Sequence, residues 1–186
     1  MQRLFQLTVV LGAFSVGACG GDSYAPLATV ESVDLNRYQG TWYEIARLPM
    51  WFQRDCVRSQ AQYTLDAGAG GVEVINSCTT RDNEVKTVRG RATVVDVASN
   101  AKLEVEFDNW FSRLFPGFTK GPYWIIALAP DYSSAMVGHP NRKYLWILAR
   151  TPRLEETRYD SLLARAAELG FDTEALIRRP PEDDQR

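Results

Sequence analysis

A run of eight short segments rich in Val, Ile, Tyr, Trp and Thr, between residues 40 and 150, constrains the fold more than any other feature. Segments of this kind are typical of β-strands, and clusters of Gly, Pro, Asn and Asp separate them as turns. Because the connections are short, successive strands are expected to form an antiparallel meander rather than βαβ units. The expected strands cover residues 40–48, 56–65, 71–78, 85–96, 101–107, 122–129, 134–139 and 143–150.

Several of these segments are apolar on both faces, as in YWIIAL at 123–128 and YLWILA at 144–149. A sheet with one face in water would alternate apolar and polar residues. A closed barrel with an apolar lumen and a helix packed on its outside provides two apolar environments, and eight strands leave room inside for one small ligand. We therefore predict an all-β chain, an eight-stranded antiparallel up-and-down β-barrel with one C-terminal α-helix at about residues 154–169 packed outside. A flat sandwich with a helix on one face is the alternative.

The N-terminus has the features of a secretory leader. Arg3 precedes an apolar stretch, and small residues lie directly before Cys19. This arrangement resembles the bacterial lipobox, which implies removal of residues 1–18, lipid attachment at Cys19 and anchoring in the membrane. Because Gly20 rather than Asp follows the cysteine, the resemblance implies the outer membrane, with the protein facing the periplasm. An ordinary signal peptide with an incidental cysteine is the alternative.

These boundaries predict the domain organisation. After the signal peptide, a lipid-anchored tether is expected over residues 19–33, rich in Gly, Ser and Pro in its first part. A single folded domain is expected over residues 34–178, which is an ordinary domain length. A loose tail, with prolines and mostly charged residues, is expected over residues 179–186.

Three motifs lie at strand ends in the predicted strand region. Gly40-Thr-Trp42 begins the first strand, Pro130-Asp131-Tyr132 joins the sixth and seventh, and Arg150 ends the eighth. In order and spacing they resemble the motifs of the lipocalin family over residues 34–172. The sequences WYEIA and YLWIL resemble the bacterial outer-membrane lipoproteins of that family and its apolipoprotein D-like members most. The resemblance implies a barrel that binds a fatty acid or a lysophospholipid-like ligand.

Strand parity places the motif residues together. In an up-and-down barrel odd strands run one way and even strands return, so Trp42, Tyr132 and Arg150 are expected at the same end. There the guanidinium can lie over the indole face and donate to carbonyls left by the turns. We expect this end to be closed, with a structural role for its signature residues, Gly40, Trp42, Asp131, Tyr132 and Arg150.

The loops at the opposite end carry large aromatic residues, where loops are usually polar. Such a patch marks a ligand mouth or a membrane contact, and an inward cap on the core is the alternative. If Trp42 and Trp146 point inward, alternate residues on their strands point inward too. A shift of the strand register by one residue would exchange the inward and outward residues. The candidate ligand-binding residues of lumen and mouth are Glu44, Ala46, Trp51, Phe52, Trp110, Phe111, Phe118, Tyr144, Trp146 and Leu148.

Two cysteines remain once Cys19 is lipidated. Cys56 and Cys78 flank the predicted hairpin and are roughly equidistant from its centre, so a cross-strand disulfide at the open end fits the geometry. An exported protein meets an oxidising compartment that allows it. A free catalytic thiol is the alternative, although no activating base is apparent nearby.

Other chemistry finds little support in the sequence. A net charge of −2 without a basic stripe argues against nucleic acid as a partner. His139, the only histidine, is expected in an exposed loop, and a zinc site would need at least three ligands, so no metal or other cofactor is expected. Glu104 and Glu106 are expected to face solvent. The direction of Arg89 and Arg91 stays open, since an inward arginine could bind an anionic head group.

The leading functional hypothesis is therefore binding, storage or transport of an amphipathic lipid at the outer membrane, without catalysis. One alternative is an enzyme that uses the barrel as a hydrophobic chamber. Another is a structural envelope lipoprotein whose filled barrel binds no ligand.

Overall fold

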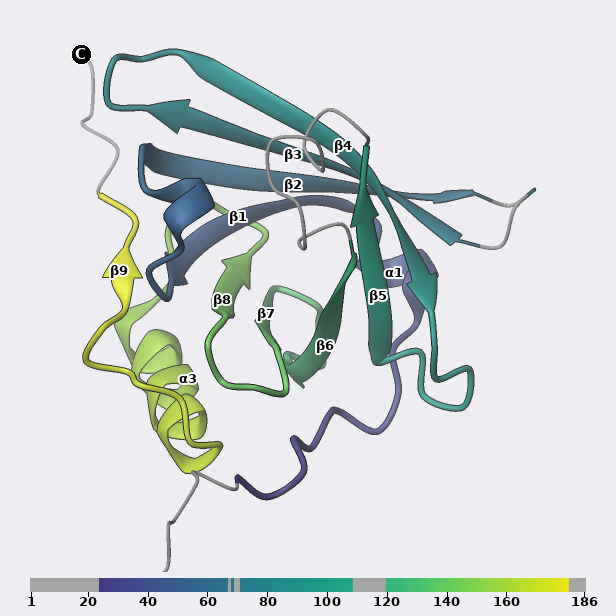
Figure 1. The fold of residues 1–186 in the computed structure, drawn as a ribbon. Helices are drawn as coiled ribbons and strands as arrows, with labels where there is room; N and C mark the ends of the chain where they lie inside the picture. The colour runs from purple at the N-terminus through teal and green to yellow at the C-terminus, as the bar shows by residue number, and fades with distance from the viewer. Residues whose placement is uncertain (1–23, 67, 69–70, 109–119, 181–186) are drawn as a thin grey trace, which may run out of the picture.

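The computed structural model describes residues 24–66, 68, 71–108 and 120–180. Eight antiparallel strands follow one another around a barrel (Figure 1), which closes because the first strand pairs with both the second and the eighth. The predicted eight-stranded up-and-down barrel is confirmed. The strands are β1 (Gly40–Arg47), β2 (Cys56–Asp66), β3 (Gly71–Thr80), β4 (Val85–Val94), β5 (Lys102–Phe107), β6 (Lys120–Leu128), β7 (Ser134–Gly138) and β8 (Leu145–Ala149).

The predicted C-terminal helix is present as α3 (Glu156–Glu168), along the outside of the barrel beside β8 (Figure 1). Its buried residues Tyr159, Leu162 and Ala166 lie on one face and pack on the outer side of the barrel wall. The helix ends at Glu168, and Gly170 follows its C-cap with φ of 84°, the left-handed conformation that favours glycine after a helix.

Two hydrophobic clusters explain why the strands are apolar on both faces. An inner cluster lies within the barrel and includes Trp42, Val74 and Leu148. An outer cluster lies between the wall and α3, and includes Ile147 and Leu162. Successive residues of a strand point to opposite faces, so Ile147 and Leu148 reach different clusters. The flat sandwich is excluded because β1 pairs with both β2 and β8, which closes the sheet into a barrel.

A β-bulge in β1 changes which residues face inward. The register between β1 and β8 shifts between Glu44 and Ala46, so that Ile45 is the extra residue. As a result Ile45 and Ala46 both belong to the outer cluster, while Glu44 lines the interior. The prediction that Ala46 follows Trp42 and Glu44 into the lumen was wrong, because strict alternation fails at a bulge.

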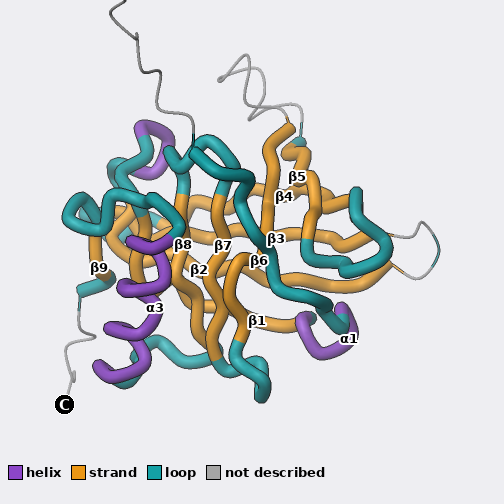
Figure 2. The backbone as a smooth tube through the Cα atoms, turned by 90° about the horizontal axis from the view of Figure 1, so that it is seen from below, coloured by secondary structure: helices purple, strands orange, loops and turns teal. Residues whose placement is uncertain are grey.

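Three further elements were not predicted. Helix α1 (Leu35–Tyr38) precedes β1 and is capped by Asp34, whose side chain accepts a hydrogen bond from the backbone of Asn36. The 3₁₀ helix η1 (Trp51–Gln53) lies in the loop between β1 and β2. Strand β9 (Ile177–Arg178) pairs with Arg47 and Ala46 of β1, beyond the stretch where β1 pairs with β2. Figure 2 shows α1 at one end of the barrel and α3 along its side.

The segments on either side of the barrel are held against it. In the described part of the predicted tether, Leu27 and Val33 are buried, and the Val30 amide donates to the Ile125 carbonyl. At the other end Arg179 donates its backbone amide to the Ile45 carbonyl at 2.7 Å, so the first residue of the predicted tail is ordered on β1. Within the described ranges, no helix is long and apolar enough to cross a membrane.

The closed end has the predicted contact between the motif residues. The Arg150 guanidinium carbon lies 3.9 Å from the centroid of the Trp42 ring. The same guanidinium donates to the carbonyls of Thr41, Tyr132 and Arg37, at 3.0, 3.3 and 2.7 Å. Gly40, with φ of 94°, lies where an added Cβ would come within 3.3 Å of this guanidinium. Asp131 accepts from the Ser133 amide and shapes the adjacent turn.

Candidate functional site

A cavity of about 600 Å³ occupies the lumen of the barrel. Its walls are largely apolar, with Ala61, Val74, Val105, Phe107 and Leu148 among the lining residues. Cavities of this size and character hold small apolar molecules in many proteins. The lumen is therefore hollow. An inert barrel would instead have a lumen filled by side chains.

Aromatic side chains surround the open end of the cavity. Trp51, Phe52, Tyr144 and Trp146 all line it, as the sequence predicts. Tyr144 stacks on Trp146 with ring centroids 6.5 Å apart and lies 6.3 Å from Phe52. Trp51 is 52% exposed, so it is an apolar surface at the entrance rather than an inward cap. The other predicted mouth residues, Trp110, Phe111 and Phe118, lie outside the described residues.

Charged groups also line the entrance: Arg54, Asp55, Lys86 and His139. His139 is only half-buried but faces the cavity, so the expectation of a solvent-exposed loop histidine was incomplete. Its Nδ1 accepts a hydrogen bond from the Asn141 amide at 3.1 Å. Burial lowers the pKa of His139, which favours the neutral imidazole. Arg54 and Lys86 are therefore the fixed positive charges of the rim.

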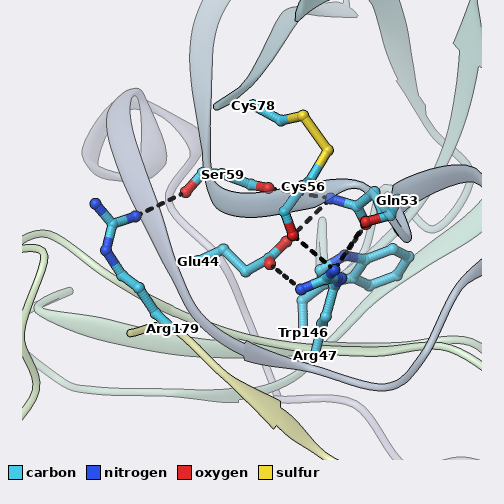
Figure 3. A network of polar contacts seen from close by, with 8 residues as sticks. All are labelled: Glu44, Arg47, Gln53, Cys56, Ser59, Cys78, Trp146 and Arg179. Atoms are coloured by element: carbon cyan, nitrogen blue, oxygen red, sulfur yellow. Dashed lines mark hydrogen bonds and ion pairs between the residues drawn. A yellow bond between two sulfur atoms is a disulfide. The ribbon is translucent and has the colours of Figure 1, made fainter. Parts of the chain in front are cut away.

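A buried polar network lies on the lumen side of β1 (Figure 3). One oxygen of the Glu44 carboxylate accepts from Arg47 Nη1 and the other from Gln53 Nε2, each at 3.1 Å. Gln53 also receives a weak hydrogen bond from the Trp146 indole at 3.4 Å. Burial raises the pKa of Glu44, while the Arg47 cation and the Gln53 amide act in the opposite direction.

The same network fixes the loop at the entrance. Arg47 Nη2 donates to the carbonyls of Gln53 and Cys56, at 2.8 and 3.1 Å, and so joins both ends of the segment that follows η1. Arg47 and Gln53 were not predicted as site residues. The inward direction of Arg47 depends on the β1 bulge, and that of Gln53 on the short helix η1, and neither has a clear signal in the sequence.

The far end of the lumen is formed by tyrosines. Tyr63 of β2 and Tyr123 of β6 line the cavity, and their hydroxyl oxygens are 3.0 Å apart. Tyr38 of α1 lies behind them, with its hydroxyl 3.0 Å from that of Tyr123 and its ring 4.8 Å from Trp42. These tyrosines were also not predicted as site residues, although Tyr63 and Tyr123 lie within the predicted strands 56–65 and 122–129.

Cys56 and Cys78 form a disulfide, as predicted, with Cα atoms 5.6 Å apart. Figure 3 shows the disulfide beside the polar network. Both cysteines line the cavity at its entrance. The disulfide therefore joins β2 to β3 at the open end. The alternative of a free catalytic thiol is excluded at these two positions in the oxidised protein.

The charged pairs on the middle strands point away from the lumen. Arg89 pairs with Glu73, and Arg91 pairs with Asp66, all four at least one-third exposed. Glu104 and Glu106 both lie near Lys120 on the outer face. The two arginines therefore do not provide an inward binding site for an anionic head group. Among residues the structure describes, no three His, Cys, Asp or Glu residues are grouped as a metal site would require.

Comparison with known proteins agrees with this architecture. A family model described as "Lipocalin-like domain" matches residues 33–181. The outer membrane lipoprotein Blc of Citrobacter freundii is 37% identical over 179 residues, covering 95% of this chain and 96% of its own. Apolipoprotein D of Bos taurus is 34% identical over 151 residues, covering 76% and 71%. Insecticyanin from the tobacco hornworm Manduca sexta has the same fold, with a TM-score of 0.66 and 22% identity over 88% of this chain and 91% of that one.

The similarity to these proteins covers nearly the whole folded region. It agrees with the strand order of the barrel, the contact of Arg150 with Trp42 and the hollow apolar lumen. Family membership and the cavity together support the binding of a hydrophobic ligand. This chain belongs to the lipocalin family, and within it resembles bacterial lipoproteins and apolipoprotein D.

Proposed function

We propose that this lipocalin binds an amphipathic lipid with one alkyl chain, a fatty acid or a lysophospholipid, and stores or transports it at the outer membrane. The observation that carries the proposal is the hollow apolar lumen with charged side chains confined largely to its entrance. An alkyl chain gains free energy from leaving water for such walls, at about 25 cal/mol for each Å² of apolar surface buried.

The depth of the lumen fits a single chain. Cys56 lines the entrance and Tyr63 the far end of the same strand, which places them roughly 20 Å apart along the strand. With the usual strand tilt of about 40°, the depth along the barrel axis is about 15 Å. The hydrocarbon core of a bilayer is about 30 Å thick, so one leaflet accommodates a tail of about the same length.

The rim favours an orientation with the tail inward. Arg54 and Lys86 lie at the entrance, where they can attract a carboxylate or a phosphate, with Asp55 as the opposing charge. Inside, the Arg47 cation is already paired with Glu44 at 3.1 Å, so it is not available to an anionic head group that enters the lumen. An anionic head at the rim with the tail in the lumen is therefore favoured.

Gly121 offers a direct test. It lines the cavity, and an added Cβ would meet nothing within 4 Å, so a side chain there would extend into the lumen without displacing the wall. We expect Gly121→Trp to weaken binding of a fluorescent fatty acid at least tenfold, while Gly121→Ala binds like the native protein. Circular dichroism would confirm that both variants fold. Unchanged affinity in Gly121→Trp would contradict lumen binding.

The ligand itself can be identified by mass spectrometry of lipids extracted from protein purified without detergent. We expect fatty acids or lysophospholipids in stoichiometric amounts. An empty extract, together with no uptake of either lipid class, would favour the structural envelope protein. The enzyme alternative is weakened because the disulfide removes two thiols as nucleophiles.

The proposed location is supported by the lipobox-like sequence before Cys19 and by the name of the Citrobacter relative. Cys19 lies outside the described residues, and its lipidation stays a prediction. Labelled palmitate should be incorporated into the full chain and not into Cys19→Ser, and only the variant should leave the outer-membrane fraction. Equal labelling of both proteins would contradict lipid attachment at this residue.

A further inference from the structure

The far end of the lumen contains a chain of three phenols that the proposed function does not use. Tyr123 is the central member, with its hydroxyl oxygen 3.0 Å from those of Tyr38 and Tyr63. Tyr63 and Tyr123 line the cavity, whereas Tyr38 lies behind them against Trp42 and is not among the lining residues. We call these residues the tyrosine triad.

Counting protons shows that the tyrosine triad has one hydrogen-bond donor to spare. Three hydroxyls carry three protons, and the two hydrogen bonds between them use two. No other described side chain or backbone group bonds to these hydroxyls. One O–H group is therefore left without an acceptor within the part of the protein that the structure describes.

The spare donor faces the cavity unless Tyr38 keeps the unpaired proton. If Tyr38 donates to Tyr123, the spare proton belongs to Tyr63 or to Tyr123, and both line the lumen. In the remaining arrangement Tyr38 would keep an unpaired proton behind the wall. Leaving a buried donor unpaired is costly, so that arrangement is disfavoured.

The tyrosine triad remains a donor throughout the physiological pH range. Burial raises the pKa of Tyr63 to about 12 and raises the pKa of Tyr123 as well. The phenols therefore stay protonated at neutral pH. A ligand group that meets them must accept a hydrogen bond, and a terminal methyl group cannot.

We propose that the tyrosine triad is a donor subsite for an oxygen atom at the deep end of the bound lipid, so that the preferred ligand is a single-chain lipid oxygenated at that end. This inference rests on the proposed lumen binding and adds the ligand chemistry. The oxygen has two possible sources. It is a hydroxyl or carbonyl oxygen near the end of the tail, or the carboxyl group of a fatty acid that enters head first.

The test compares hexadecanoic acid with 16-hydroxyhexadecanoic acid, which differ only by the terminal oxygen. Dissociation constants would be measured by calorimetry for the native protein and for the triple variant Tyr38→Phe, Tyr63→Phe, Tyr123→Phe. An ordinary net hydrogen bond corresponds to an affinity change of about 5- to 10-fold. We expect the native protein to prefer the hydroxylated acid by this factor, and the triple variant to lose the preference.

The pattern of losses identifies the oxygen. If only the hydroxylated acid binds less tightly to the triple variant, the tail oxygen occupies the subsite. If hexadecanoic acid weakens equally, the carboxyl group enters first. Tyr43→Phe is the matched control, because Tyr43 packs against the outer cluster on the same strand as Trp42. If the triple variant does not fold, Tyr63→Phe with Tyr123→Phe removes both lumen-facing hydroxyls.

The outcomes separate the two proposals. Equal affinity of the native protein for both acids, with neither affinity changed in the triple variant, would overturn the donor subsite and leave lumen binding intact. A preference for the hydroxylated acid that survives in the triple variant would also overturn it. Failure of the native protein to bind either acid would overturn lumen binding and the subsite together.

Discussion

Glu44 and Arg47 form an ion pair of 3.1 Å on the lumen side of β1, although strict strand alternation would place them on opposite faces. The bulge at Ile45 brings them to the same side, and both side chains are less than one-tenth exposed. An ion pair buried this deeply pays a large desolvation cost, which additional hydrogen bonds offset. Here Gln53 and the carbonyl of Cys56 provide those bonds and join the pair to the entrance loop.

The first prediction concerns pH. Because burial raises the pKa of Glu44 in the folded state, the folded protein holds this proton more tightly than the unfolded chain does. The stability that Glu44 contributes is therefore fully present below its unfolded pKa, about 4.5, and declines as pH rises through the folded pKa. We expect the free energy of unfolding of the native protein, relative to Glu44→Gln, to fall between pH 4.5 and pH 7.

Urea titrations of both proteins over this range would measure the difference, because Gln does not titrate and the other groups are shared. A difference that increases with pH would contradict the prediction. It would mean that the Arg47 cation lowers the pKa of Glu44 more than burial raises it.

The second prediction concerns the closed end. Arg150→Ala removes the guanidinium from the Trp42 ring and leaves three carbonyl groups without this donor. We expect a loss of about 3 kcal/mol in the free energy of unfolding, from the cation–π contact and the charged hydrogen bonds together. Arg165→Ala is the control, because its ion pair with Glu168 is exposed and should cost less than about 1 kcal/mol. Similar losses in both variants would contradict a special role for Arg150.

The strand order and the contact of Trp42 with Arg150 could be predicted because they follow from parity and from short connections. Each predicted strand is present, with ends displaced by at most two residues. The disulfide could be predicted because Cys56 and Cys78 lie on the two strands of one hairpin, at roughly similar distances from its turn. These inferences use only the order of the strands and the positions of the residues along the chain.

The parts of the site that were missed depend on local departures from regular geometry. The side chain of Ala46 points outward because of one extra residue in β1, and no residue type there signals a bulge. Arg47 and Gln53 meet Glu44 only after that bulge and after η1 have turned them. The tyrosine triad combines α1, β2 and β6, so its hydroxyls converge only in the closed barrel.

The third prediction concerns packing between β7 and the segment after α3. An added Cβ at Gly138 would lie 2.7 Å from Cζ of Phe171 and 2.9 Å from Cδ1 of Ile126, closer than van der Waals contact allows. We expect Gly138→Ala to lower the free energy of unfolding by about 1–3 kcal/mol through overpacking.

Gly121→Ala is the matched control for that variant, because the added methyl group meets no atom within 4 Å and should change stability by less than about 1 kcal/mol. Adding Phe171→Leu to Gly138→Ala should recover part of the loss, since it removes the ring that the new Cβ would meet. Chemical denaturation of the four proteins would measure both effects. Equal stability of the two alanine variants would contradict tight packing at Gly138.

The last prediction concerns the disulfide at the entrance. Cys56→Ala with Cys78→Ala opens a loop with a sequence separation of 22 residues, which corresponds to about 3 kcal/mol of stability in the chain-entropy account. The Cys56 carbonyl would still accept a hydrogen bond from Arg47, so the entrance loop stays attached to β1 without the disulfide. We therefore expect lower stability in urea but fatty-acid affinity within about threefold of the native value, which is less than a typical hydrogen bond contributes. A large loss of affinity without a loss of stability would instead show that the disulfide itself contacts the ligand.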